Sequence, residues 1–217
     1  MRMYNAEWEA IKGFQHTPNF VDVAFDLGNG EIPADHGHAL FEELARLLPW
    51  LRQHPELGVH PVMGAPTGRN DNLMINKRVK LILRVPVDRI PDLSPLLGQS
   101  INPGAGALTI VALKERPLMA FGYLYSHFVS METEDEAEFL AAAREELEKL
   151  QVGCGLIPGK KRKMMSPSGN VWGYSLMLHD VDPQQSLRIQ ELGLGTRRNQ
   201  GCGLFIPHKS IKEVVVD

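Results

Sequence analysis

The sequence has little cysteine and no recognisable zinc-binding motif. Its 217 residues include only Cys154 and Cys202 as cysteines, and neither a C-x-x-C pair nor an H-E-x-x-H motif occurs. Two such cysteines cannot build a disulfide framework or a cysteine-ligated zinc site. We therefore expect both to be small core residues, and we expect the protein to work without a metal or another cofactor.

Long apolar segments are also missing. No run reaches the roughly 18 apolar residues that a membrane helix needs. The first segment, MRMYNAEWEAIKGF, carries Glu7 and Glu9 where a secretory signal would have an apolar region. With 43% hydrophobic and 23% charged residues, the composition is that of a soluble globular protein. We expect a cytoplasmic protein with no membrane partner.

Positive charge is scarce overall, and it is unevenly distributed. The formal net charge is -3, whereas nucleic-acid-binding proteins are usually basic. Residues 132–148 hold eight Asp or Glu and one Arg, whereas residues 155–217 hold nine Lys or Arg and five Asp or Glu. A segregated positive surface attracts a polyanion even when the total charge is negative. The last third of the chain is therefore the candidate surface for such a ligand.

The first half of the chain predicts the element order β-α-β-β-α-β. Alternating apolar residues predict strands, at 20–27, 58–63, 77–85 and 108–113. Helical spacing predicts a helix that begins at Asp35, as its N-cap, and ends before Pro49, and a second helix at 87–97. Residues 1–18 precede this unit as an extension, and Glu115-Arg116-Pro117 marks the boundary after it.

The second half repeats the same order. Strands are expected at 118–131, 155–165, 171–179 and 202–206, and helices at 134–150 and 182–192. Asp182 and Pro183 are typical of a helix start. Two such units predict an α+β fold of two tandem ferredoxin-like (βαββαβ, RRM-like) domains, residues 19–116 and 117–217. Each would be a four-stranded antiparallel sheet backed by two helices.

A glycine- and arginine-rich segment follows the last predicted helix. Arg197 and Arg198 can clamp phosphate oxygens, and Lys209 follows beyond the last strand. Glycines let a backbone approach a ligand closely and offer exposed N–H groups. The glycines here are Gly193, Gly195, Gly201 and Gly203. They precede a strand, unlike a dinucleotide fingerprint, and phosphate binding and a plain helix-to-strand connection explain them equally well.

A basic run, Lys160-Lys161-Arg162-Lys163, lies on or beside a predicted hairpin of the second unit. Such a run commonly binds phosphates or the groove of an RNA stem, although a solvated charged turn is the plain alternative. Arg188, on the helix before the glycine-rich segment, would extend the same patch. In addition, Phe121, Tyr123 and Tyr125 alternate onto one sheet face. Such rings stack bases in RNA-recognition sheets, but core packing is the favoured interpretation.

The segment GLGTRRNQGCGLFIPHKSI resembles the C-terminal glycine-rich signature of the CRISPR-associated endoribonucleases that process repeat RNA, in the RAMP superfamily. The segments PADHGHALFEELARLLPWL and GVHPVMG resemble the myxan-type branch of that family, and the similarity runs from Phe20 to Ile211. The resemblance implies metal-independent cleavage of CRISPR precursor RNA within each repeat, which releases guide RNAs. It also implies a catalytic histidine early in the first helix.

Two histidines stand at that place, in Asp35-His36-Gly37-His38. Cleavage without a metal needs a base for the ribose 2′-OH and a proton donor for the 5′-oxygen, and histidine suits either role. Residues two apart point to different sides of a helix. His36 falls nearer the predicted buried stripe, at the rim of a groove, and His38 falls toward solvent. We predict His36 as catalytic with His38 as the alternate; a capping or surface histidine is the competing interpretation.

Weaker candidates are His60, which matches the family pattern but fits a structural role at a strand end, and His208 beside the glycine-rich segment. The leading hypothesis is an endoribonuclease that leaves 2′,3′-cyclic phosphate and 5′-OH ends on CRISPR repeat RNA. A second is a non-catalytic RNA-binding subunit of a CRISPR effector complex, with the other subunits as partners. A third is a small-molecule enzyme with a closed apolar pocket. The oligomeric state and the repeat sequence stay open.

Overall fold

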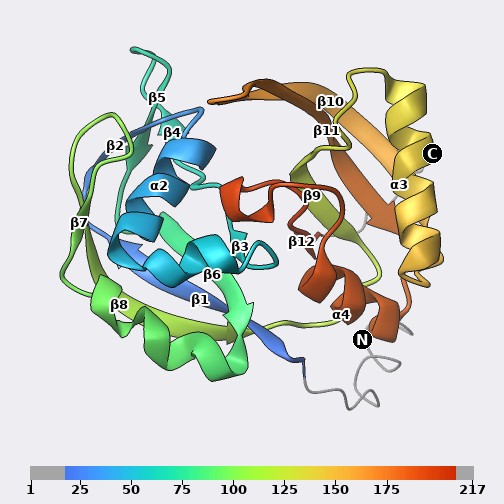
Figure 1. Ribbon diagram of the computed structural model, residues 1–217, viewed down its shortest axis with the longest axis horizontal. Coiled ribbons are helices and arrows are strands. Elements are labelled where there is room, and N and C mark those ends of the chain that lie inside the picture. Colours follow the sequence, from blue (N-terminus) through green and yellow to red (C-terminus); the bar gives the residue numbers. More distant parts are fainter. Residues whose placement is uncertain (1–17, 209–217) are drawn as a thin grey trace, which may run out of the picture.

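The computed structural model describes residues 18–208. Lys209 and nearly all of the predicted extension, residues 1–17, lie outside the described residues. The fold is α+β, with one main sheet in each half of the chain and helices packed against each sheet (Figure 1). Within residues 18–208, no helix is long and apolar enough to cross a membrane.

The first sheet is centred on β1 (Phe20–Leu27), which pairs antiparallel with β6 on one side and β8 on the other. The strand order is β3-β6-β1-β8-β7. The other strands are β3 (Gly58–Val59), β6 (Lys80–Pro86), β7 (Ser100–Ile101) and β8 (Leu108–Pro117). Helix α2 (Gly37–Leu47) covers this sheet because Leu40 and Leu44 on its apolar stripe join Val23 and Phe25 in one core.

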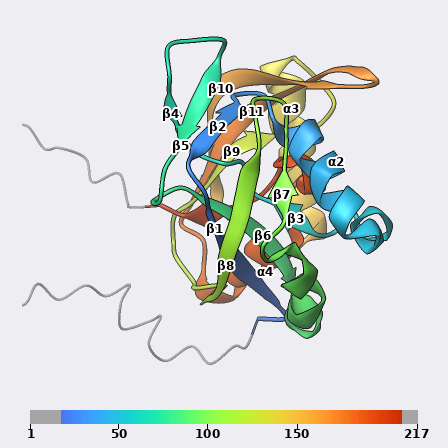
Figure 2. The ribbon, with the colours of Figure 1, turned by 90° about the vertical axis from the view of Figure 1, so that its left-hand side faces the viewer.

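Three parts of this half differ from the sequence prediction. The strand expected at 58–63 is only β3, Gly58–Val59. The second helix is a 3-10 helix, η2 (Val87–Leu96), because Pro91 and Pro95 inside it lack the N–H groups that an α-helix needs. A small three-stranded sheet, at the upper left in Figure 2, was not predicted. Its strands are too short to show an alternating pattern: β2 (Gly30–Pro33), β4 (Ala65–Pro66) and β5 (Asn72–Ile75). A short 3-10 helix, η1 (Pro49–Gln53), follows α2.

The second sheet has the order β10-β11-β9-β12. Its strands are β9 (Leu124–Val129), β10 (Gly155–Ser166), β11 (Gly169–His179) and β12 (Ile206–Pro207). It is backed by α3 (Glu136–Lys149) and α4 (Pro183–Leu192), and a short 3-10 helix, η3 (Arg198–Gln200), lies in the glycine-rich segment. The predicted start of α4 is confirmed, because the Asp182 side chain accepts the N–H of Gln185 and Pro183 opens the helix.

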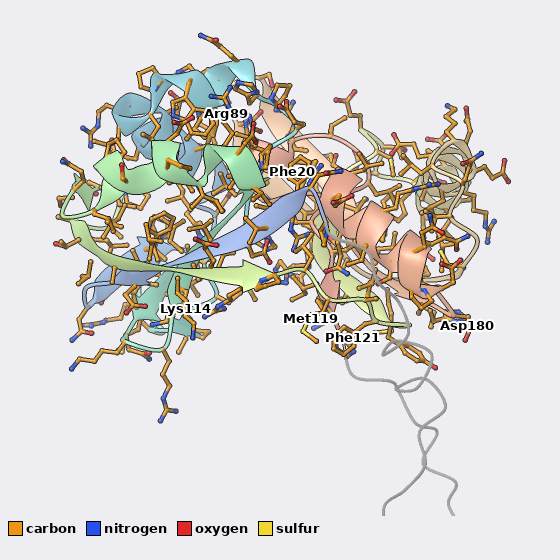
Figure 3. All side chains as sticks on the ribbon, turned by 90° about the horizontal axis from the view of Figure 1, so that it is seen from below. Phe20, Arg89, Lys114, Met119, Phe121 and Asp180 are labelled. Atoms are coloured by element: carbon orange, nitrogen blue, oxygen red, sulfur yellow. The ribbon has the colours of Figure 1, made fainter. Side chains whose placement is uncertain are left out.

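The connection between the halves differs from the prediction of one strand over 118–131. The first sheet continues to Pro117, and β9 begins only at Leu124. In between, Leu118 and Ala120 are buried, whereas Met119 and Phe121 lie on the lower face and are 54% and 37% exposed (Figure 3). The alternation that suggested a strand thus comes from packing against α4, not from sheet pairing. The last strand is likewise β12, Ile206–Pro207, and not 202–206.

A fully buried arginine joins the two halves. Arg84 on β6 donates from Nε and Nη2 to the Asp22 carboxylate on β1. Its Nη1 donates to the backbone carbonyls of Gln190 and Phe205, at 2.9 and 2.8 Å. Because both acceptors belong to the second half, this side chain fixes the relative position of the two sheets.

Candidate functional site

The ring of His36 is held at the start of α2, where it is the N-cap residue and only 4% exposed. Its Nδ1 lies 2.7 Å from the carbonyl oxygen of Pro33, and its Nε2 accepts the N–H of Val62 at 2.9 Å. This pair of bonds requires a neutral ring with the proton on Nδ1. Burial lowers the pKa of His36, which outweighs the opposing effects of Pro33 and Asp35. The expected place at the rim of a groove is therefore wrong: His36 is a wall residue with both nitrogens engaged.

The residues on either side of His36 contact the second half of the chain. Asp35 was predicted to cap the helix, but the helix start has no side-chain cap, and the Asp35 carboxylate instead accepts the N–H of Met165 on β10 at 2.7 Å. Gly37 lies so close to the glycine-rich segment that a Cβ there would stand 2.3 Å from the carbonyl oxygen of Gln200. The start of α2 is thus docked against β10 and η3, in contact with both.

The glycine-rich segment forms a folded loop whose N–H groups point inward. Eight N–H groups between Gly193 and Gly203 donate to protein oxygens, including that of Gly195 to Glu146 and that of Gly203 to the Phe128 carbonyl. The prediction that these glycines offer exposed N–H groups is therefore wrong. Their value is close packing in left-handed conformations, since a Cβ on Gly203 would stand 2.0 Å from the Leu194 carbonyl oxygen.

A cavity of about 360 Å³ lies where these elements meet. Its walls come from the start of α2, the 61–64 segment, β9, β10 and the glycine-rich loop. The charged or titratable side chains in the lining are Asp35, His36, His127, Arg162 and Lys163. Because Met63 and Lys163 in the same lining are exposed, the cavity opens to solvent. The predicted helix start, basic run and glycine-rich segment, which lie far apart in the sequence, are thus brought together.

The predicted RNA-binding side chains divide into two groups. Arg162 and Lys163 line the cavity. Lys160 is exposed beside a bulge of β10, and Lys161 pairs with Glu134 at 3.1 Å and lies over the Trp172 ring. The four basic residues therefore belong to strand β10, and Lys161 is paired with Glu134 in the segment before α3.

The other predicted arginines lie mainly inside the protein. Arg188 donates to the Leu150 carbonyl at the end of α3. Arg198 is buried and donates to the Leu192 carbonyl at the end of α4; burial, with a smaller effect of Arg84, lowers its pKa to about 10. Arg197 is half-buried in a left-handed conformation beside η3. These contacts give Arg188 and Arg198 a structural role in capping helix ends.

The remaining predicted histidines are not among the residues that line the cavity. His38 is half-buried, is not part of the cavity lining, and has a buried Nδ1 without a partner among the described residues. His60 is buried with its Nε2 3.5 Å from Asp22, which agrees with a structural role. The His208 ring packs against Tyr125, at 5.7 Å between centroids.

Sequence reasoning missed His127, which lines the cavity from β9. Its signal was available, because alternation along the strand places it on the same face as Tyr125. The favoured core interpretation of the three aromatic rings is wrong, because Tyr123 and Tyr125 are half-buried and Phe121 is exposed; of the three, Tyr125 alone belongs to β9. Within residues 18–208, no group of three or more His, Cys, Asp or Glu side chains is arranged to hold a metal ion.

A family model and a curated relative of the same family both match this chain. A family model described as Cas6 Crispr matches residues 21–210. A CRISPR-associated endonuclease Cas6 from Myxococcus xanthus (strain DK1622) is 35% identical over 189 residues, which cover 87% of this chain and 81% of the relative.

Solved structures share the fold. A CRISPR-associated protein Cas6 has a TM-score of 0.64 at 12% identity, covering 88% of this chain and 100% of that one. Cse3 of Thermus thermophilus, bound to an RNA representing a pre-cleavage complex, has a TM-score of 0.52 at 15% identity, covering 87% and 98%. With the matched family model spanning most of its length, the chain belongs to the Cas6 family of CRISPR-associated endonucleases.

Proposed function

We propose that the protein is a metal-independent endoribonuclease that cleaves CRISPR precursor RNA within its repeats and so produces guide RNAs. The observation that carries the proposal is the cavity between the two halves, where Arg162 and Lys163 face the start of α2. Two cations in a partly enclosed site suit a phosphodiester and the charge that develops on it during cleavage. Membership of the Cas6 family supports the same substrate.

The reaction that we propose uses the RNA itself as the nucleophile. The 2′-OH of the ribose attacks the adjacent phosphorus, the bond to the 5′-oxygen breaks, and the products carry 2′,3′-cyclic phosphate and 5′-OH ends. This route needs a base and a proton donor but no metal. Arg162 and Lys163 stabilise the phosphate oxygens as the phosphorus becomes five-coordinate.

The predicted catalytic role of His36, with His38 as alternate, stays a prediction. In the structure His36 can accept a proton only if the Val62 N–H leaves its Nε2. The same engagement is what a non-catalytic RNA-binding subunit of an effector complex would show, and it is the observation that favours this second candidate function. The two candidates differ in whether bound repeat RNA is cut.

The strand orders support a tandem domain organisation. In each main sheet the order is second-third-first-fourth, counting β1, β3, β6 and β8 in one half and β9, β10, β11 and β12 in the other. This is the order of a ferredoxin-like domain, with β7 added at one edge of the first sheet. We propose two ferredoxin-like domains, residues 19–116 and 117–217, with residues 1–18 as an extension.

The test is cleavage of a synthetic repeat RNA from a CRISPR array of the source organism, with EDTA present. We expect one cut per repeat, a cyclic phosphate on the upstream product, and no cut when the scissile ribose is 2′-deoxy. Tight binding of the ribose RNA without any cleavage would instead establish the non-catalytic subunit. A need for added divalent ions would contradict the proposed chemistry.

A further inference from the structure

We propose that His127 is the general base of RNA cleavage, so that the proton-accepting group lies on the second sheet and faces the start of α2 across the cavity. The inference rests on the proposed function, because it assigns the proton transfer that this reaction requires. It places catalysis between the domains, with one wall from each.

The position of His127 within β9 directs it into the cavity. The pairing of β9 with β11 shifts register between Ser126 and Val129, and the two residues at this irregularity, His127 and Phe128, both line the cavity. Leu124 and Val129, on either side of it, lie in the core with residues of α3 and α4. On the neighbouring strand β11, Gly173 pairs with Arg162 of β10. A Cβ on Gly173 would stand 2.0 Å from the Val129 carbonyl oxygen and 2.6 Å from the Phe128 ring. With no side chain on Gly173, the Arg162 guanidinium and His127 can share the cavity across that strand.

His127 is the cavity histidine whose ring nitrogens are available. Both nitrogens of His36 are engaged by Pro33 and Val62. Within residues 18–208, no protein group forms a hydrogen bond or ion pair with the His127 ring, which is half-buried and not sealed from the cavity. A free lone pair at the wall of an open cavity is what a base needs to reach a ribose hydroxyl.

The surroundings of His127 favour its neutral form. Burial lowers its pKa below the ordinary value, and Arg162 and His36 lower it further. The other charged groups of the lining are Asp35 at the start of α2 and Lys163 on β10. At neutral pH the ring is therefore unprotonated and can accept a proton. A phosphate held by Arg162 and Lys163 would bring the adjacent 2′-OH to the same wall.

In the proposed step, a ring nitrogen of His127 takes the proton of the 2′-OH while the 2′-oxygen forms its bond to phosphorus. The bond between phosphorus and the 5′-oxygen breaks, and the departing 5′-oxygen takes a proton from water. The imidazolium of His127 then returns its proton to solvent. No proton is gained or lost overall, and the ring is ready for another turnover.

The first experiment separates cleavage from binding in the full chain. General acid–base catalysis contributes about 100-fold to 10,000-fold in rate, so we expect His127→Ala to slow single-turnover cleavage of repeat RNA by at least about 100-fold. The dissociation constant for the uncleavable 2′-deoxy RNA should stay within about threefold of the wild-type value. His179→Ala is the matched control, since His179 lies at the end of β11 beside Asp180, outside the cavity. Equal losses of cleavage and binding would make His127 a binding group and overturn the assignment.

The second experiment identifies the proton that His127 handles. Imidazole added to the His127→Ala protein should raise its cleavage rate in proportion to the concentration of neutral imidazole. A cleavage rate that does not change when imidazole is added overturns the base role. In a substrate with sulfur in place of the scissile 5′-oxygen, the sulfur leaving group departs as a thiolate and needs no proton from an acid. If His127 is the base, the defect of His127→Ala persists with this substrate; if the defect disappears, His127 is the acid and the assignment fails.

The outcomes distinguish a failure of the proposed RNA cleavage from a failure of the role of His127. If the wild-type protein cuts neither the oxygen nor the sulfur substrate, the proposed function fails. If the wild type cuts both and His127→Ala cuts them at the wild-type rate, only the role of His127 fails. His127→Gln, which keeps a side chain of similar size, together with the melting temperature of each variant, ensures that a folded protein is compared throughout.

Discussion

Arg84 and Asp22 face each other on neighbouring strands, and two N–H groups of the guanidinium donate to the two carboxylate oxygens at 2.7 and 2.9 Å. Burial alone would raise the pKa of Asp22, but the nearby His60 ring and the hydrogen-bonded Arg84 guanidinium outweigh it and hold that pKa well below its ordinary value. The Arg84 side chain has no exposed surface. Removal of either partner therefore leaves a charge inside the protein without its counter-charge.

We expect Asp22→Ala to lower the free energy of unfolding by about 3 to 5 kcal/mol, the usual effect of breaking a buried ion pair. Urea denaturation followed by circular dichroism measures this loss. Glu42→Ala is the control, because Glu42 pairs with Arg52 at the surface, where ion pairs contribute little. Equal effects of the two substitutions would mean that the buried pair contributes no more than an exposed one.

The stability of the fold should fall as the pH drops below about 6.5, the ordinary pKa of histidine. The pKa of His36 is lowered in the folded state, chiefly by burial. Its neutral ring therefore contributes fully above the unfolded-state value and contributes progressively less as the pH falls below it. Melting temperatures at pH 7.5 and 5.5 should differ more for the wild type than for His36→Gln. An identical difference in both proteins would show that His36 does not contribute to the pH dependence.

The basic residues of the cavity should account for part of the salt dependence of RNA binding. Lys163→Ala should weaken binding and reduce the slope of log affinity against log salt by about 0.7 to 0.9, the value for one lost phosphate contact. Filter binding of 2′-deoxy repeat RNA at several salt concentrations gives the slope. An unchanged slope would place Lys163 outside the RNA path.

Arg188 should behave differently, although the sequence places it in the same patch. Its guanidinium donates to the Leu150 carbonyl and to Gln151 at 3.0 and 3.3 Å. We expect Arg188→Ala to lower the melting temperature and to leave the salt slope of RNA binding unchanged. A reduced slope with an unchanged melting temperature would return Arg188 to the binding surface.

The docking of α2 against the glycine-rich loop should be sensitive to one methyl group. A Cβ on Gly37 would stand 2.3 Å from the Gln200 carbonyl oxygen and 2.8 Å from the Met164 sulfur. We expect Gly37→Ala to destabilise the protein by about 1 to 3 kcal/mol, as overpacking does, and to slow cleavage because the cavity wall shifts. Gly153→Ala is the control, since no atom lies within 4 Å of a Cβ there. Wild-type stability and cleavage in Gly37→Ala would show that the contact is loose.

The sequence predicted the α+β class, the main strands and helices in order, and the start of α4, because alternation, helical spacing and capping residues are local signals. It also singled out three segments that the structure brings to one cavity. What failed were the details that depend on distant partners. The His36 ring accepts the N–H of Val62, 26 positions away, so the sequence around His36 gives no sign that the ring is engaged and buried. The Asp35 carboxylate accepts the N–H of Met165, 130 positions away, so the local sequence suggested only a helix cap.

Charge misled the prediction for a related reason. Arg188 and Arg198 are residues of the type that binds phosphate, but in the structure their guanidinium groups donate hydrogen bonds to backbone carbonyls at the ends of two helices. The sequence does not indicate that these arginines lie beside the ends of helices, because that depends on the fold. Conversely, His127 stood in no motif, and its importance follows from its place opposite α2 and beside Arg162, which pattern alone does not specify.

The inward-pointing N–H groups of the glycine-rich loop change what its sequence signature reports. A Cβ on Gly193, Gly195 or Gly203 would meet atoms of the second half of the chain, and a Cβ on Gly201 would meet Pro61 of the first half, so these glycines serve packing within the protein. A homologue could keep the whole signature and the docked loop after losing the residues that cut RNA. The signature therefore identifies a common architecture, and the chemistry of each member is decided by the side chains lining its cavity.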